Sequence, residues 1–259
     1  MAEVVIVDSP EAGGALAASL IASVVAARPD AVLGLATGST PLPVWSALAG
    51  LDLDLGRVRG FALDEYIGLS PGHPESYRAV IDREVVGPLG LTPSLVHVPA
   101  EGFAGAALAG AGDAYETLID AAGGVDLQVL GIGRTGHIGF NEPGSSLASL
   151  TRVKTLTEWT RRDNARFFGG DVARVPLHCV TQGLGTILRA RRLVLLAWGE
   201  SKAEAVAAAV EGPVTASVPA SVIQLHRDVT VVVDAPAASA LRYADYYREA
   251  WDSRPDWLR

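Results

Sequence analysis

The chain has 259 residues, with 21 basic and 29 acidic side chains and a formal net charge of −8. An apolar content of 49% excludes a disordered chain, and the length allows one domain with a substantial core. The acidic balance, without a dense stripe of lysine and arginine, argues against a nucleic-acid partner.

Short β-branched runs alternate with Ala/Leu-rich stretches along the chain. In chain order we expect a strand at Val4–Val7, a helix at Ala12–Ala27, a strand at Val32–Ala36, a helix from about Pro41, strands at Val58–Leu63 and Leu95–Pro99, a helix at Ala104–Ala122, strands at Leu127–Ile132 and Leu193–Trp198, a helix at Lys202–Val210 and a strand at Val229–Val233.

These strand runs are continuously apolar, as expected where helices cover both faces of a parallel sheet. The alternation therefore predicts an α/β fold with a doubly wound, mostly parallel sheet and helices on both faces, a Rossmann-like arrangement. No Pro/Gly/Ser-rich linker or internal repeat divides the chain, so we expect a single domain over residues 1–259.

The sequence also bears on the compartment. The one cysteine, Cys179, cannot form an internal disulfide, which favours a reducing compartment. No apolar run approaches the roughly 20 residues that span a bilayer. The N-terminal MAEVVIVDSP lacks the basic stretch that precedes the apolar part of a signal peptide. We expect a cytoplasmic protein without a membrane partner.

Ligands of such sheets bind beyond the carboxyl ends of the strands. There, Leu33–Pro41 (LGLATGSTP) runs from a strand into Gly38, Ser39 and Thr40, with a proline suited to the first helical position. Free amides at a helix N-terminus, together with hydroxyls, bind phosphate. The same pattern also suits an ordinary N-cap.

A pair of acidic residues, Asp64 and Glu65, follows directly on another strand in FALDEYIG. Carboxylates at a sheet edge are often solvated turn residues. Alternatively, one of them is a general base whose basicity is set by a pocket.

A glycine-rich segment, Leu130–Gly144 (LGIGRTGHIGFNEPG), follows the strand at Leu127–Ile132 and contains G-x-G-x-x-G. A dinucleotide site would need a helix to open at the third glycine, but HIGFNEPG is too rich in Gly and Pro. We therefore reject that interpretation. A loop here can turn His137 and Glu142 toward one substrate.

Two cations lack an obvious explanation. Ser201 and Glu204 in WGESKAE form a plausible capping box, which places Lys202 in the first helical turn. The helix dipole disfavours a cation there unless an anion is bound. Arg166, in TRRDNARFF, has no sequence partner, although most surface arginines need none.

Metal and thiol chemistry are not indicated. The five histidines are scattered, and neither H-x-x-x-H nor C-x-x-C occurs, so we expect no metal site. No G-x-S-x-G nucleophile elbow is present. Cys179 suits a small buried apolar position.

Seven segments taken in order resemble the glucosamine-6-phosphate deaminase family of the bacterial type, from about Val32 to Asp234. They are ATGSTP, LDEYIGL with HPESY, LGIGRTGHIGFNEPGSSL, TRVKTLT, NARFF, GESKAEAV and PASVIQLH. The resemblance implies an enzyme of amino-sugar catabolism that converts the amino-sugar phosphate glucosamine 6-phosphate and water into fructose 6-phosphate and ammonium. This aldose–ketose isomerisation with deamination uses no cofactor.

The resemblance also assigns roles by position. Asp64 corresponds to the base that moves a proton between carbon-2 and carbon-1, His137 to the acid/base that opens the pyranose ring, and Glu142 to its carboxylate partner. A carboxylate within hydrogen-bond reach suits such proton transfer, and a remote phosphate supplies binding energy. The implied phosphate-binding residues are Gly38, Ser39, Thr40, Arg166 and Lys202.

One position departs from the family pattern. Thr135 stands immediately before the Gly-His pair, where relatives carry Asp or Asn. Threonine makes one hydrogen bond but brings no negative charge. We therefore expect His137 to be held less strongly as imidazolium, which shifts the pH dependence of ring opening.

Regulation and assembly stay open. Ser145, Arg152 and Lys154 match positions that bind an N-acetylglucosamine 6-phosphate activator between subunits in allosteric relatives, yet they also suit a solvated basic strand. Relatives are monomers or hexamers, so a homo-oligomer and a monomer are both possible. The tail Trp251–Trp257 suits a lid, an interface or a frayed end.

Three alternative functions remain. A galactosamine-6-phosphate deaminase/isomerase differs only in the substrate epimer. A 6-phosphogluconolactonase-type hydrolase would use His137 as a base on water and would not need Asp64. A non-catalytic sugar-phosphate sensor would not require Asp64, His137 and Glu142 together.

Overall fold

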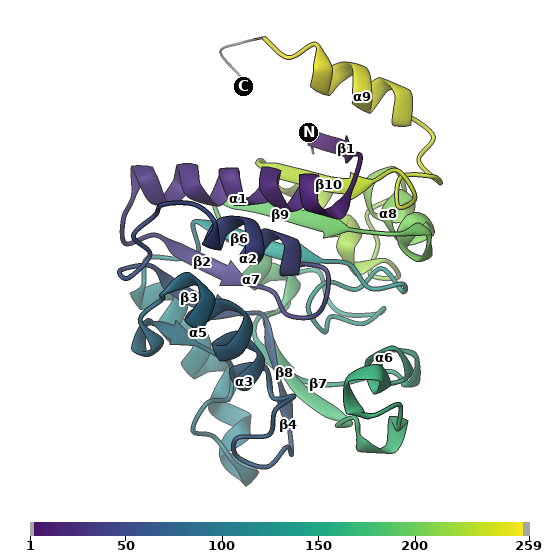
Figure 1. The fold of residues 1–259 in the computed structure, drawn as a ribbon. Helices are drawn as coiled ribbons and strands as arrows, with labels where there is room; N and C mark the ends of the chain where they lie inside the picture. The colour runs from purple at the N-terminus through teal and green to yellow at the C-terminus, as the bar shows by residue number, and fades with distance from the viewer. Residues whose placement is uncertain (1–2, 256–259) are drawn as a thin grey trace.

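The computed structural model of the chain describes residues 3–255, and a seven-stranded parallel sheet runs through its centre (Figure 1). Its strands β9 and β10 are buried along almost their whole length, as strands are when helices cover both faces. The predicted doubly wound, single-domain α/β fold is confirmed. In spatial order the strands are β1 (Glu3–Val7), β10 (Val229–Asp234), β9 (Arg192–Ala197), β6 (Leu127–Gly131), β2 (Val32–Leu35), β3 (Arg59–Ala62) and β5 (Val96–His97).

Helices surround this sheet, and α1 packs beside α2 over the strands (Figure 1). The α-helices are α1 (Pro10–Ala27), α2 (Leu42–Ala49), α3 (Tyr77–Ile81), α4 (Gly87–Leu89), α5 (Ala111–Ala121), α6 (Glu158–Asn164), α7 (Leu184–Leu188), α8 (Ala203–Val210) and α9 (Ala244–Asp252). Short 3₁₀ segments that matter below are η3 (Gly105–Gly110), η4 (Ala165–Phe168) and η6 (Glu200–Lys202).

A second, antiparallel sheet was not predicted. It comprises β4 (Asp64–Ile67), β8 (His178–Thr181) and β7 (Arg152–Thr155), with β8 in the middle (Figure 1). The interpretation of Asp64 as a solvated turn residue is therefore wrong, because it begins β4 and is buried. One face of this sheet packs on a small apolar cluster that contains Cys179, fully buried, as well as Tyr66 and Phe168.

Some predicted boundaries need correction. The expected strand Leu95–Pro99 contributes only the two residues of β5. The expected helix Ala104–Ala122 opens as the 3₁₀ segment η3, and α5 starts at Ala111. Glycines at both ends of η3 account for this difference, because glycine disfavours an α-helical interior.

The expectation that no apolar run reaches membrane-spanning length also needs correction. Among the described residues, α1 has 18 residues and a mean hydropathy of 1.4, which suffices by length and composition. Its small residues nevertheless approach the core closely: a Cβ on Gly13 would lie 2.4 Å from the Trp198 ring, and Ala17 is fully buried. In this fold α1 serves as a helix that packs on the sheet.

A buried carboxylate, Glu116, joins α5 to the start of β7 and to α7. Its Oε1 accepts hydrogen bonds from the backbone N–H and hydroxyl of Thr151 and from the Thr186 hydroxyl, and Arg189 pairs with Oε2. Burial by itself raises the pKa of Glu116, but the hydrogen bonds from Thr151 and Thr186 and the Arg189 charge outweigh it and leave the pKa lowered.

We expect Glu116→Gln to reduce the free energy of unfolding by about 1–3 kcal/mol at neutral pH, because a buried charge-assisted network loses its anion. A carboxyl group with a depressed folded pKa stabilises above its unfolded pKa and loses that contribution as pH falls through the folded pKa. The difference between variant and parent should therefore shrink below about pH 4. Urea titration across pH measures it. The exposed Glu158→Gln should change stability little, and equal losses in the two variants would contradict the prediction.

Candidate active site

A cavity of about 140 Å³ lies beyond the carboxyl ends of β2, β3 and β6. The loop after β2, the start of β4, the loop after β6, the α6–η4 segment and η6 each contribute to its walls. The structure therefore brings together residues from distant parts of the chain. Of the predicted catalytic and phosphate-binding residues, those on its walls are Gly38, Ser39, Thr40, Asp64, His137, Arg166 and Lys202.

The loop after β2 lines the cavity with Gly38, Ser39 and Thr40, which offer backbone amides and hydroxyls. Gly38 has φ +86°, a left-handed conformation that favours glycine. Pro41 occupies the N-cap of α2 rather than its first turn, and no side chain caps this helix. The alternative of an ordinary side-chain N-cap is therefore wrong. Ser39 and Thr40 remain placed to donate to an anion.

Two cations, Lys202 and Arg166, also line the cavity. Neither Lys202 nor Arg166 makes an ion pair within residues 3–255, although the Arg166 guanidinium lies 4.7 Å from the Phe167 ring centroid. The expected capping box does not form, because Lys202 itself holds the N-cap position of α8 with no capping side chain. Burial lowers the pKa of Lys202, Asp163 opposes this shift, and Arg166 adds to it. These unpaired cations would be stabilised by an anion.

Asp64 reaches the cavity from the start of β4 and is 6% exposed. Burial raises its pKa well above the usual range, the neighbouring charge of Glu65 raises it further, and a hydrogen bond from the Phe140 N–H opposes both. A carboxyl group with a raised pKa can both accept and return a proton near neutral pH.

The adjacent Glu65 has a different, structural role, which was not predicted from the sequence. Its carboxylate accepts from the backbone N–H groups of Tyr66, Tyr77 and Arg78 at 2.7, 2.9 and 2.9 Å. It thereby fixes the first turn of α3 and the Tyr77 ring, which lines the cavity. No local pattern in the sequence signals this role, because Tyr77 and Arg78 lie 12 and 13 positions after Glu65.

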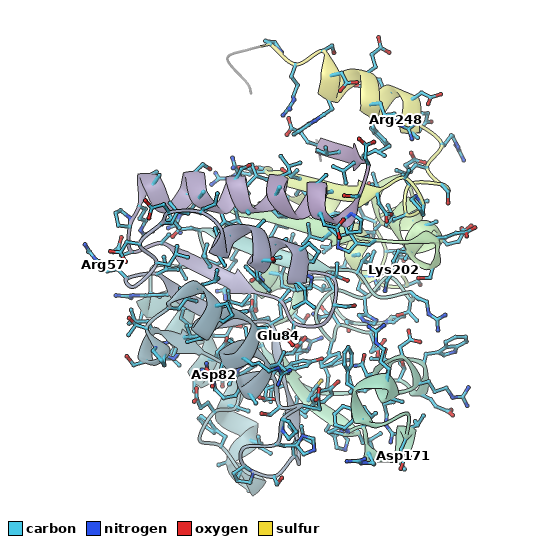
Figure 2. All side chains as sticks on the ribbon, in the orientation of Figure 1. Arg57, Asp82, Glu84, Asp171, Lys202 and Arg248 are labelled. Atoms are coloured by element: carbon cyan, nitrogen blue, oxygen red, sulfur yellow. The ribbon has the colours of Figure 1, made fainter. Side chains whose placement is uncertain are left out.

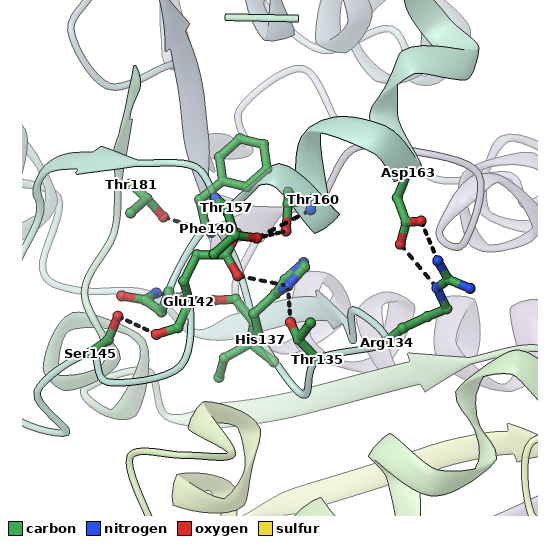
Figure 3. A network of polar contacts seen from close by, with 12 residues as sticks. Arg134, Thr135, His137, Phe140, Glu142, Ser145, Thr157, Thr160, Asp163 and Thr181 are labelled. Carbon is green, nitrogen blue, oxygen red and sulfur yellow. Dashed lines mark hydrogen bonds and ion pairs between the residues drawn. The ribbon is translucent and has the colours of Figure 1, made fainter. Parts of the chain in front are cut away.

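His137 lies between two partners on one side of its ring (Figure 3). Its Nδ1 is 2.9 Å from the Thr135 hydroxyl oxygen and 3.6 Å from Oε2 of Glu142. Because Nδ1 faces these groups, Nε2 is the nitrogen available to a ligand in the cavity. Burial lowers the pKa of His137, Glu142 opposes this, and Lys202 adds to it. A Cβ on Gly133 would lie 2.1 Å from Cε1 of the imidazole, so this position needs glycine.

Glu142 is buried behind His137 and does not line the cavity. Its Oε1 accepts from the backbone N–H and the hydroxyl of Thr157 at 3.2 and 3.0 Å (Figure 3). Its Oε2 is buried without a hydrogen-bond partner. Glu142 is therefore a positioning residue that reaches the cavity only through His137.

Two further side chains on the walls were missed, Tyr77 and Asn164. The Asn164 amide donates to the Tyr66 hydroxyl at 2.9 Å, and the Tyr77 hydroxyl donates to the same oxygen at 3.4 Å. This chain of contacts ties α6 to β4 and α3 beneath the cavity. The segments HPESY and NARFF carry two of these residues, but no spacing pattern reveals a contact over 98 positions.

The expected activator residues lie elsewhere. Ser145 is 2% exposed, and its hydroxyl donates to the Glu142 carbonyl at 2.7 Å. Arg152 and Lys154 alternate along β7 and so share one face of the small sheet. Burial lowers the pKa of Arg152. None of the three lines the cavity.

Comparison with known proteins identifies the family of this chain. The family described as glucosamine-6-phosphate isomerases/6-phosphogluconolactonase matches residues 9–232. The chain belongs to this family. Within it, glucosamine-6-phosphate deaminases of Bifidobacterium longum (strain DJO10A) and Streptomyces coelicolor are 56% and 58% identical, covering 99% and 98% of both chains.

Solved structures agree. A structure described as a monomeric glucosamine-6-phosphate deaminase superposes with a TM-score of 0.88 and 42% identity, covering 92% of this chain and 99% of that one. A 6-phosphogluconolactonase from Trypanosoma cruzi has a TM-score of 0.75 at 21% identity, covering 93% and 97%. The second likeness shows the shared family fold alone.

Proposed function

We propose that the chain is a cytoplasmic enzyme of amino-sugar catabolism that converts glucosamine 6-phosphate and water into fructose 6-phosphate and ammonia. The observation that carries this proposal is the placement of Asp64 and His137 on the walls of one cavity that the cations Arg166 and Lys202 also line. Relatives at 54–58% identity over nearly the whole chain are named for this activity.

The geometry suits each step. The Nε2 of His137 exchanges protons with the ring oxygen and the anomeric hydroxyl, which opens the pyranose. Asp64 then removes the proton from carbon-2 and returns it to carbon-1, so that an enolamine becomes an imine. Water adds to that imine at carbon-2, and ammonia leaves. The phosphate, held by Arg166, Lys202 and the Gly38–Thr40 loop, anchors the flexible open chain.

The alternatives fit less well. A lactonase has no use for Asp64, which is buried in β4 and faces the cavity. A sensor needs no histidine backed by a buried carboxylate.

An assay distinguishes glucosamine 6-phosphate from its epimer galactosamine 6-phosphate as the substrate: ammonia release is measured from both sugar phosphates. We expect faster release from glucosamine 6-phosphate. Release from galactosamine 6-phosphate alone would change the substrate, and release from neither would defeat the proposal.

Arg166→Gln is expected to raise KM about 10-fold or more with a smaller change in kcat, because it removes a charge-assisted contact to a part of the substrate remote from the reacting carbons. Steady-state ammonia release across substrate concentration measures it. The exposed Arg174→Gln serves as the control on the neighbouring segment. An effect confined to kcat would contradict the assignment of Arg166 to the phosphate.

Thr135→Asp is expected to keep the overall reaction and to change its pH profile. An aspartate 2.9 Å or so from Nδ1 adds a negative charge that favours imidazolium, so the pKa of His137 rises. The limb of the rate profile that depends on protonated His137 should then extend to higher pH. Rates from pH 5 to 9 measure it, with Thr135→Ser as the conservative control. Complete loss of activity in Thr135→Asp would contradict this expectation.

Assembly and regulation are proposals as well. We propose a monomer, supported by the 42%-identical relative that is described as monomeric. Light scattering tests this, and a hexamer would overturn it.

If Ser145, Arg152 and Lys154 form an activator site, N-acetylglucosamine 6-phosphate should shift the velocity curve to lower substrate concentration. Superimposable curves would remove that assignment. Of the predicted tail Trp251–Trp257, residues from 256 onward lie outside the described residues.

A further inference from the structure

His137 lies between an unsatisfied anion and a cation-lined cavity. Oε2 of Glu142 is buried, has no hydrogen-bond partner and stands 3.6 Å from Nδ1 (Figure 3). This separation is longer than a charge-assisted hydrogen bond, which closes to about 2.7–2.9 Å. At this distance Oε2 makes no hydrogen bond with Nδ1, whose nearer neighbour is the Thr135 hydroxyl at 2.9 Å, yet Oε2 is placed to attract a proton on Nδ1.

The surroundings of His137 favour the neutral form of its ring when no phosphate is bound. Burial lowers the pKa of His137, and the Lys202 charge lowers it further, against Glu142 and Asp163. Arg134 holds Asp163 in a two-pronged ion pair at 2.6 and 3.1 Å, which offsets the Asp163 charge. The charged or titratable groups that share the cavity with the ring or act on its charge are Glu142 from its own loop, Asp64 from β4, Tyr77 from α3, Asp163 from α6, Arg166 from η4 and Lys202 from η6.

We propose that the phosphate of the substrate, bound at Lys202 and Arg166, converts His137 to imidazolium, the acid of the ring-opening step. The Nδ1–H of this imidazolium then donates a hydrogen bond to Oε2 of Glu142. This inference rests on the proposed function and deepens it. Phosphate carries a charge of about −1.5 to −2 at pH 7. It therefore more than cancels the Lys202 charge that disfavours protonation, in a cavity where charges are screened less than in bulk water.

The ring-opening step then balances without another acid. Imidazolium gives its Nε2 proton to the ring oxygen as the bond from that oxygen to carbon-1 breaks. The anomeric hydroxyl passes its proton back to Nε2 as the carbonyl at carbon-1 forms. His137 ends as imidazolium, still paired with Glu142. When an amino sugar without phosphate binds, His137 stays neutral and cannot act as the acid. The enzyme would therefore select phosphorylated over unphosphorylated amino sugars in turnover as well as in binding.

The test is a histidine-ring ¹⁵N NMR titration of the full chain, with and without inorganic phosphate, at constant ionic strength. The His137 signals are identified by their loss in His137→Gln. Amide shifts of Gly38 and Ser39 report independently that phosphate occupies the site. We expect phosphate to raise the titration midpoint of His137 by about one pH unit, as a nearby opposite charge does.

Variants separate this coupling from a general effect of salt. In Lys202→Gln the midpoint without phosphate should lie above that of the parent, and phosphate should move it less. Lys202→Arg should restore the parent response because it restores the charge. Arg57→Gln serves as the matched control, since this exposed cation lies at the opposite edge of the molecule (Figure 2), and it should titrate as the parent does.

The outcomes are distinct. If the Gly38 and Ser39 amides shift while the His137 midpoint stays, the inference is overturned and the proposed function survives. If the amides do not shift, the phosphate assignment fails and the inference falls with it. A rate arm completes the test: inorganic phosphate should raise ammonia release from unphosphorylated glucosamine about 10-fold, within the range of general acid catalysis. A moved midpoint without this gain would overturn the catalytic half of the inference.

Discussion

Replacing Asp64 by asparagine is expected to lower kcat about 10²–10⁴-fold with little change in KM. The amide cannot accept the carbon-2 proton, while the phosphate contacts that dominate binding stay in place. Ammonia release measures the loss, and incorporation of solvent deuterium at carbon-1 of the product should fall with it. The matched control is Asp245→Asn, whose side chain is fully exposed on α9. Undiminished activity in Asp64→Asn would remove Asp64 as the base.

The same substitution should stabilise the fold. A carboxyl group whose folded pKa is raised destabilises the native state above its unfolded pKa, because burial disfavours its charged form. Asparagine removes that cost, so Tm should rise at neutral pH and match the parent more closely at acidic pH. A lower Tm at neutral pH would contradict this. Such an exchange of stability for activity is common at active sites.

The central sheet could be predicted from sequence because its strands are short apolar runs that need no alternating pattern. The second sheet could not. β4 and β7 read DEYI and RVKT, with charged and apolar residues mixed. β4 is almost wholly buried although it begins with two carboxylates, and β7 exposes its valine, so neither strand shows the pattern of an apolar core strand. Their pairing joins Asp64 to Thr181 and Arg152 to the same residue, contacts that no local pattern encodes.

The site could be predicted from the sequence where its functional residues lie close together in one segment. The loop with His137 and Glu142 follows β6 and the loop Gly38–Thr40 follows β2, so each group of residues lies in one short segment after a buried strand. The supporting contacts were not predictable, because Glu65 acts on backbone amides and Asn164 meets Tyr66 across 98 positions. Sequence also could not show that Nδ1 of His137 has two competing partners at different distances.

His137→Gln is expected to lower kcat about 10²–10³-fold and to remove the limb of the pH profile that reports its protonation. Glutamine fills similar space but exchanges no proton, so ring opening reverts to the slow uncatalysed process. Steady-state rates from pH 5 to 9 measure the change. His178→Gln, on an exposed position of β8, is the matched control.

An open-chain ligand separates chemistry from structure in this variant. The amino alditol 6-phosphate has no ring to open. At about pH 9, where linked protonation of His137 no longer contributes to phosphate binding, it should inhibit His137→Gln and the parent with inhibition constants within about 3-fold of each other. A large loss of that affinity would show that His137 shapes the cavity rather than opens the ring.

The kcat of Glu142→Gln should fall between those of the parent and His137→Gln. The glutamine amide still occupies the space 3.6 Å from Nδ1 but no longer stabilises imidazolium. Activity of Glu142→Gln equal to the parent would mean that Thr135 alone suffices to orient the ring.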